Sequence, residues 1–247
     1  MSRSNSEQSS SDNLGAAILL GVCVAAGLII MGYLLSAAAL DIKAFERSVT
    51  VKGLSERDYP ADTVIWPIQF TAADNDLGKL YQSLDNSTAK IRGFLASKGI
   101  SIDAISVSAP AITDKSAQQW GTTPHAEFRY TAVQTVTVYS QKVELVRSVM
   151  TSLSELGREG IVFSGGNYET RPDYVFSKLN DVKPEMIEEA TKKAREVAVK
   201  FAQDSESTLG KIKQASQGQF SIAPRDNNNP HIKKVRVVST VEYYLSD

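Results

Sequence analysis

The chain has 247 residues, and its 27 Lys and Arg against 28 Asp and Glu give a formal net charge of −1 at pH 7. This balance lacks the basic surface that nucleic acids require, so we expect no nucleic-acid partner. Cys23 is the single cysteine, which excludes an intrachain disulfide framework.

An apolar run without charges extends from Leu14 to Leu40, after a polar leader at residues 1–13 that we expect to be disordered. A bilayer core of about 30 Å needs about 20 apolar residues in a helix, so residues 14–40 predict a transmembrane anchor with the lipid bilayer as its partner. A cleaved signal sequence is the alternative, because Ser36-Ala37-Ala38 is a small-x-small site, although signal h-regions are usually about 7–15 residues long.

Basic residues near this run bear on which side of the membrane the domain occupies. Arg3 precedes the run, whereas Lys43, Arg47 and Lys52 follow it, which favours a cytoplasmic domain under the positive-inside rule. Large domains are translocated largely regardless of such charges. The charges alone therefore leave the sidedness open.

The first half of the domain predicts strands around one helix. Residues 48–51 and 62–71 predict strands, and Pro67 places the second at a sheet edge or at a bulge, because proline cannot donate to a ladder. Apolar residues at helical spacing predict a helix from Asn75 or Asp76 to about Lys98. A short strand at 105–107 and a long turn at 113–125 follow.

The second half predicts two more helices. One follows Ser140 and ends at Gly157, and the other has Pro184 in its first turn and ends at Gly210. The predicted strands of this half are 128–138, 161–163, 212–222 and 235–245. The order of elements predicts an α+β fold, in which ββα-type units pack three helices on mixed or antiparallel sheet.

The helix before Gly210 has two distinct faces. Its apolar face contains a row of alanines at i,i+4 spacing from Ala190 to Ala202, together with Val197 and Phe201. Small side chains in such a row allow the helix to lie close against a sheet or another helix. Its outer face carries Glu–Lys pairs at i,i+4 spacing, which indicate a solvated surface.

The sequence contains no HExxH, CxxC, GxSxG or P-loop pattern. Both histidines, His125 and His231, lie in predicted loops, and Asp58 and Asp62 flank a predicted turn. Glu127 could act as a general base only if a neighbour across the sheet changed its pKa. We therefore predict that the chain is not an enzyme and has no catalytic residue, cofactor or metal site.

Three aromatic residues are candidates for a partner or oligomer interface: Trp120, Trp66 and Tyr243. Trp120 lies in a polar predicted loop, where an exposed indole is more often a contact residue than part of a core. Trp66 and Tyr243 lie on predicted strand faces, where core packing is the competing interpretation.

Several short segments together carry a family resemblance. They are Val51-Lys52-Gly53, Ala61-Asp62-Thr63, Lys98-Gly99-Ile100, Tyr130-Thr131-Ala132, and the helix Ala190 to Ala202 followed by Leu209-Gly210-Lys211-Ile212. With this order of elements, residues 46–247 resemble the SIMPL domain, formerly DUF541, typified in bacteria by YggE-like periplasmic proteins. The chain departs from the family around residues 115–123 and 226–229.

The resemblance implies a location and a mode of action. Bacterial members are exported envelope proteins, some form large homo-oligomers, and several are linked to stress tolerance. No catalytic residues are established for the family, so none is carried over. We therefore expect a non-enzymatic protein of the bacterial inner membrane, single-pass, with its domain facing the periplasm.

Self-association or binding of a protein partner is the expected mode of action, through strand edges such as the Pro67 strand or the strand 235–245. One alternative is a small-ligand binding module with a concave apolar pocket. The other is an envelope enzyme whose site lies between two lobes, which requires Glu127, His125 or His231 to converge.

Overall fold

The computed structural model describes residues 20–36, 47–117, 127–164 and 170–246. Residues 20–36 form a helix whose large apolar side chains, such as Leu28 and Ile29, are exposed. The leader and the remainder of the predicted anchor, 14–19 and 37–40, lie outside the described residues. Across the described ranges, no helix is both long enough and apolar enough to cross a bilayer.

The chain divides into two compact units, each with its own buried core. The first unit contains the chain up to Leu54, residues 188–218 and residues 238–247, and the second contains residues 55–187 and 219–237. Three elements contribute residues to both units: β1 (Ser48–Pro60), α5 (Leu179–Asp204) and β10 (Ile232–Ser246).

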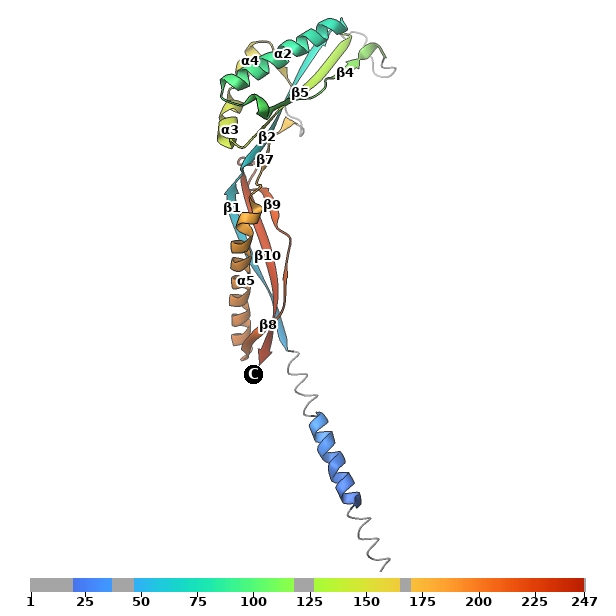
Figure 1. The fold of residues 1–247 in the computed structure, drawn as a ribbon, viewed down its shortest axis with the longest axis vertical. Helices are drawn as coiled ribbons and strands as arrows, with labels where there is room; N and C mark the ends of the chain where they lie inside the picture. The colour runs from blue at the N-terminus through green and yellow to red at the C-terminus, as the bar shows by residue number, and fades with distance from the viewer. Residues whose placement is uncertain (1–19, 37–46, 118–126, 165–169, 247) are drawn as a thin grey trace, which may run out of the picture. The chain divides into compact units, whose positions relative to one another are not determined.

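The second unit is built on an antiparallel sheet of short and long strands (Figure 1). Its central pair is β2 (Thr63–Asp74) with β5 (Tyr130–Ser140). The shorter strands are β3 (Ile105–Val107), β4 (Ala111–Asp114), β6 (Val162–Phe163) and β7 (Asp173–Val175). β3 and β4 pair with β5, and β6 and β7 pair with β2.

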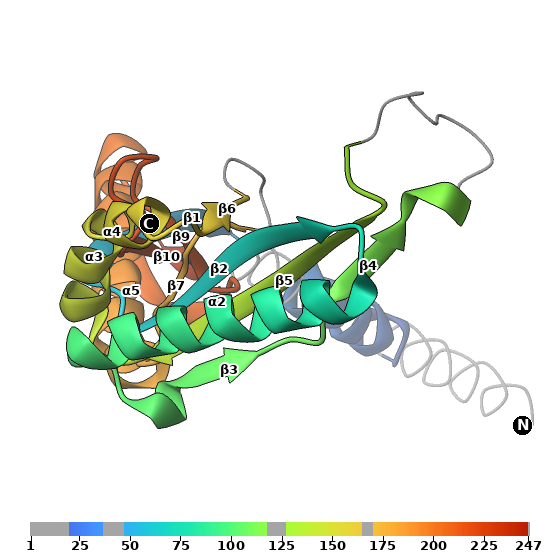
Figure 2. The same cartoon turned by 90° about the horizontal axis from the view of Figure 1, so that it is seen from above.

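Helix α2 (Leu77–Ser97) lies along β2 and β5 (Figure 2). Asp76 caps it by accepting a hydrogen bond from the backbone N–H of Lys79 at 2.9 Å. Its buried side chains are Leu80, Leu84, Ile91 and Leu95. Gly99, with φ of 89°, follows the helix in the left-handed conformation that favours glycine. The predicted helix at 76–98 is therefore confirmed.

The predicted helix at 140–157 is two helices, α3 (Val143–Thr151) and α4 (Ser154–Arg158). The chain turns between them, with the N–H of Ser152 donating to the carbonyl of Val149 at 2.9 Å. Gly157 lies inside α4 and does not end the helix. The domain thus has four helices within the described residues, α2 to α5, and its antiparallel sheets confirm the α+β class.

In the first unit, α5 packs on a sheet of β1, β10 and β8 (Thr208–Gln217). Ala190, Ala194 and Ala198 are completely buried, as the alanine row predicted. Gly53 of β1 lies so close to α5 that an added Cβ would be 1.8 Å from the carbonyl oxygen of Ala190. Strand and helix backbones are therefore in direct contact, which only glycine permits at this position.

Two parts of the α5 prediction are wrong. The helix begins at Leu179, before Pro184, and ends at Asp204, so Gly210 is not its stop. Gly210 lies in β8, where a Cβ would be 3.1 Å from the carbonyl oxygen of Tyr244 on β10. Val197 and Phe201, expected on the buried face, are 38% and 54% exposed, because the alanine row alone faces the sheet.

Pro67 does not lie on an edge strand. β2 pairs with β5 on one side, where Pro67 faces Thr137. On its other side, β7 pairs with residues 63–65 and β6 with Phe70 and Thr71. Pro67 falls between these two short strands, and a residue without an N–H donor fits where neither of them is paired.

Two loop boundaries also differ from the prediction. Part of the predicted turn at 113–125 belongs to β4 and to a 3-10 turn at Lys115–Ala117, and residues 118–125 lie outside the described part of the chain. The predicted strand at 212–222 is divided into β8 and β9 (Ser221–Pro224).

Candidate functional site

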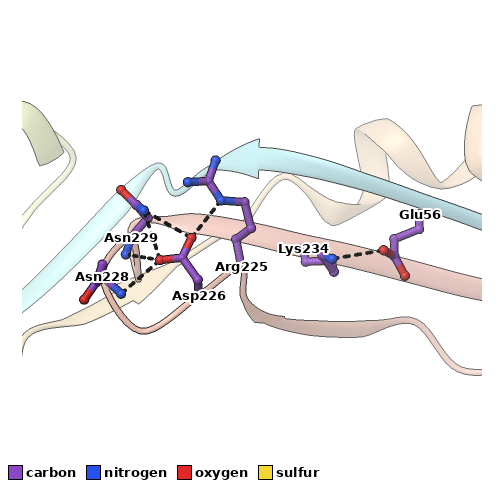
Figure 3. Close-up of polar contacts among 6 residues, drawn as sticks. All are labelled: Glu56, Arg225, Asp226, Asn228, Asn229 and Lys234. Carbon is purple, nitrogen blue, oxygen red and sulfur yellow. Dashed lines mark hydrogen bonds and ion pairs between the residues drawn. The ribbon is translucent and has the colours of Figure 1, made fainter.

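The loop between β9 and β10 is organised around one carboxylate, Asp226 (Figure 3). Its Oδ1 accepts hydrogen bonds from the backbone N–H groups of Asn228 at 2.9 Å and Asn229 at 2.8 Å, and its Oδ2 accepts from Nε of Arg225 at 2.9 Å. The Arg225 hydrogen bond is the main cause that lowers the pKa of Asp226. This carboxylate is fully engaged within its own loop.

A cleft of about 1050 Å³ lies in the second unit beside this loop. One wall is formed by residues 171–174, which include the first two residues of β7, and the other by residues from Pro224 to Lys233. Its polar lining residues are Arg171, Asp173, Asp226, Asn227 and Lys233. The volume suits a small molecule, since ligand pockets are typically about 300–1,000 Å³.

Lys233 is the unusual residue of the cleft, because it is a cation that is only 7% exposed. Among the residues that the structure describes, none forms a hydrogen bond or an ion pair with its ammonium group. Burial lowers the pKa of Lys233, and the charge of Asp173 opposes this shift. Its Nζ is not fully buried, since Oγ of Ser239 is the one fully buried side-chain polar atom without a partner in the described residues. The side chain is therefore buried along its length, and its ammonium group borders the cleft, where an anion could approach it.

His231 lies near the cleft, but its contacts indicate a structural role. Its ring is edge-on to Tyr174, with 6.1 Å between the ring centroids, and its carbonyl accepts a hydrogen bond from the N–H of Ala61 at 2.8 Å. Burial is the largest cause that lowers the pKa of His231, and the charge of Arg147 adds to it. This lowering favours the neutral imidazole.

Asp62 also has a structural role. Its carboxylate accepts hydrogen bonds from the backbone N–H of Ser177 at 2.8 Å and from Oγ of Ser177 at 2.9 Å, and Oγ1 of Thr63 donates at 3.0 Å. Burial would raise the pKa of Asp62, but these hydrogen bonds outweigh it and hold the pKa below its ordinary value. They tie the start of β2 to the segment that follows β7.

Two of the three candidate interface residues are described by the structure, and both are buried in a core. Trp66 on β2 is 4% exposed and packs in the core of the second unit, and Tyr243 on β10 is 3% exposed in the core of the first. Trp120 and His125 lie outside the described residues, and Glu127 is exposed. Within the described ranges, no group of three His, Cys, Asp or Glu side chains is placed to hold a metal ion.

The edge strands of the sheet in the first unit are β1 and β8, whereas the edges expected from sequence are interior. β10 lies between β1 and β8, and β2 is a central strand. Every residue of β8 except Leu209 is exposed, and Ile212 is 50% exposed. Nζ of Lys213 is 3.0 Å from Oε1 of Glu242, so one charge on this edge is neutralised within the unit.

Comparison with protein families finds one match. The family model described as SIMPL, protein of unknown function (DUF541), matches residues 49–242. No curated protein matches the chain. The matched range begins in β1 and ends in β10, so it contains residues of both units.

Proposed function

Since the chain belongs to the SIMPL (DUF541) family, whose function is unknown, we propose its role from its own surfaces. The chain is a non-enzymatic, membrane-anchored protein of the bacterial cell envelope that acts through self-association. The observation that carries this proposal is the exposed edge strand β8.

Anchoring is supported by the uncharged run at residues 14–40 and by the exposed apolar side chains on the helix at 20–36. Apolar surface of this extent is covered by lipid or protein when it is functional. A single pass through the inner membrane, with the domain facing the periplasm, is the topology proposed for it. Protease treatment of intact spheroplasts would degrade the domain in this topology, and resistance before lysis would contradict it.

Self-association is supported by the chemistry of the β8 edge. An edge strand presents unpaired N–H and C=O groups to which another strand can pair. Lysines on an edge oppose indiscriminate pairing. Here Lys213 is paired with Glu242, which leaves Lys211 as the remaining protective charge within the described strand. Confinement of copies to a membrane plane raises their effective concentration and favours weak contacts between them.

The test compares two matched substitutions in the full chain, Ile212→Lys on β8 and Ile222→Lys on β9. Both isoleucines are exposed, at 50% and 39%, so neither substitution creates a cavity. Light scattering in detergent and crosslinking in membranes should show an assembly for the wild type and for Ile222→Lys. Ile212→Lys should reduce the mass toward that of one chain.

A monomeric wild-type chain in both measurements would overturn the self-association proposal. An assembly that Ile212→Lys leaves intact would move the interface away from β8.

A further inference from the structure

We propose that the cleft between residues 171–174 and the loop 224–233 binds a small anion carrying a carboxylate or phosphate group. Lys233 is its principal contact, and Arg171 is a second contact. This site is independent of self-association through β8, because all of its lining residues belong to the second unit.

Two adjacent lysines on β10 lie in different environments. Lys234 is partly exposed, and its Nζ is 3.1 Å from Oε1 of Glu56 (Figure 3). Lys233 points to the opposite face, lines the cleft and is 7% exposed. The ammonium group of Lys234 is therefore paired at the surface, while that of Lys233 borders the cleft and has no ion-pair partner in the described part of the chain. An anion in the cleft would supply that partner.

The charged groups of the cleft leave an excess of positive charge. Asp226 is engaged by Arg225 and by the N–H groups of its own loop, so it is not available to Lys233. Asp173 is the remaining carboxylate of the lining, against two cations, Arg171 and Lys233. Because Asp226 is offset by Arg225, the other three charged groups leave a net charge of plus one. This net positive charge favours a ligand of low negative charge.

The walls of the cleft are restricted in conformation. Pro172, Pro224 and Pro230 line the cleft, and the Asp226 hydrogen bonds fix the loop between the last two. Proline restricts the backbone angle φ, so these walls lose little conformational freedom when a ligand binds. The amide of Asn227 lies in the same lining and offers both a donor and an acceptor for orienting a ligand.

Isothermal titration of the full chain in matched detergent, with inorganic phosphate and with acetate as separate probes, tests this site. The wild type should give saturable heat with at least one probe, which also distinguishes phosphate from carboxylate ligands. Lys233→Met should weaken binding at least tenfold. Lys234→Met removes the same charge from the adjacent residue and should change binding less than twofold.

Absence of saturable heat with both probes overturns the proposal, as does equal weakening by Lys233→Met and Lys234→Met. If Lys233→Met does not fold by circular dichroism, Arg171→Met decides the outcome. It should weaken binding several-fold, and unchanged binding would remove the anion site. Failure here leaves the β8 proposal intact, since the two rest on different residues and different measurements.

Discussion

The two units achieve burial with side chains of different size. The core of the second unit is made of large side chains, and Phe70, Leu80 and Ile91 are completely buried. The core of the first unit is made largely of small ones, with Ala194 and Ala198 against the sheet. The second unit therefore depends on apolar area, whereas the first depends on close approach of backbones, and the two should respond to opposite kinds of substitution.

Removal of volume should have its largest effect in the second unit. Phe70→Ala should lower the free energy of unfolding by about 4 kcal/mol, because it deletes a buried aromatic ring and leaves a cavity. Urea denaturation of the full chain measures the loss, and hydrogen exchange with mass spectrometry locates it. Faster exchange should occur in peptides from β2 and β5. A change below about 1 kcal/mol would mean that this core is not closely packed.

Addition of volume should have its largest effect in the first unit. Gly53→Ala should destabilise by about 3 kcal/mol, because its Cβ would be 1.8 Å from a carbonyl oxygen of α5 and the two backbones must separate. Gly93→Ala on α2 is the matched control, since its Cβ meets nothing within 4 Å. It should stabilise by about 0.5–1 kcal/mol through helix propensity. Equal effects of the two substitutions would contradict the close-approach interpretation.

The smallest expected effect concerns a carboxylate. Asp62→Asn should destabilise by about 1 kcal/mol at pH 6, because the amide replaces an acceptor of hydrogen bonds from Ser177 and Thr63. The folded-state pKa of Asp62 is depressed, so its contribution is present above the ordinary pKa of about 3.9 and is lost as the pH falls through the folded value. Urea denaturation at pH 6 and pH 3 should show the difference between variant and wild type shrinking at the lower pH. A difference that grows in acid would mean that the assigned hydrogen bonds are not formed.

The elements that could be predicted from sequence are those with long periodic patterns. Helix α2 and the alanine row of α5 follow directly from apolar spacing over many residues. β7 was not predicted, because three residues after Pro172 carry no periodic signal. The short strands β6 and β7 also explain the error at Pro67. Pro67 lies between the positions where they pair with β2, and such an unpaired position resembles an edge strand in the sequence.

Lys233 was also missed, although the sequence contains a signal for it. Val235, Val237 and Val241 have the parity of the buried face of β10. If the same alternation is continued toward the N-terminus of the strand, Lys233 lies on the buried face and Lys234 on the opposite face. A basic residue in phase with an apolar strand face is therefore a useful indicator of a buried cation, which neither composition nor a motif search detects.

The alternation along β10 has a consequence for insertions and deletions. Strand side chains alternate between faces, so a shift of one residue would expose Val235, Val237 and Val241 together and bury Lys234 and Arg236 in their place. Such a slipped strand would remove Val241 and Tyr243 from the core of the first unit. Changes in chain length near β10 must then be absorbed by the loop at residues 225–231, at the cost of the Asp226 hydrogen bonds that organise that loop.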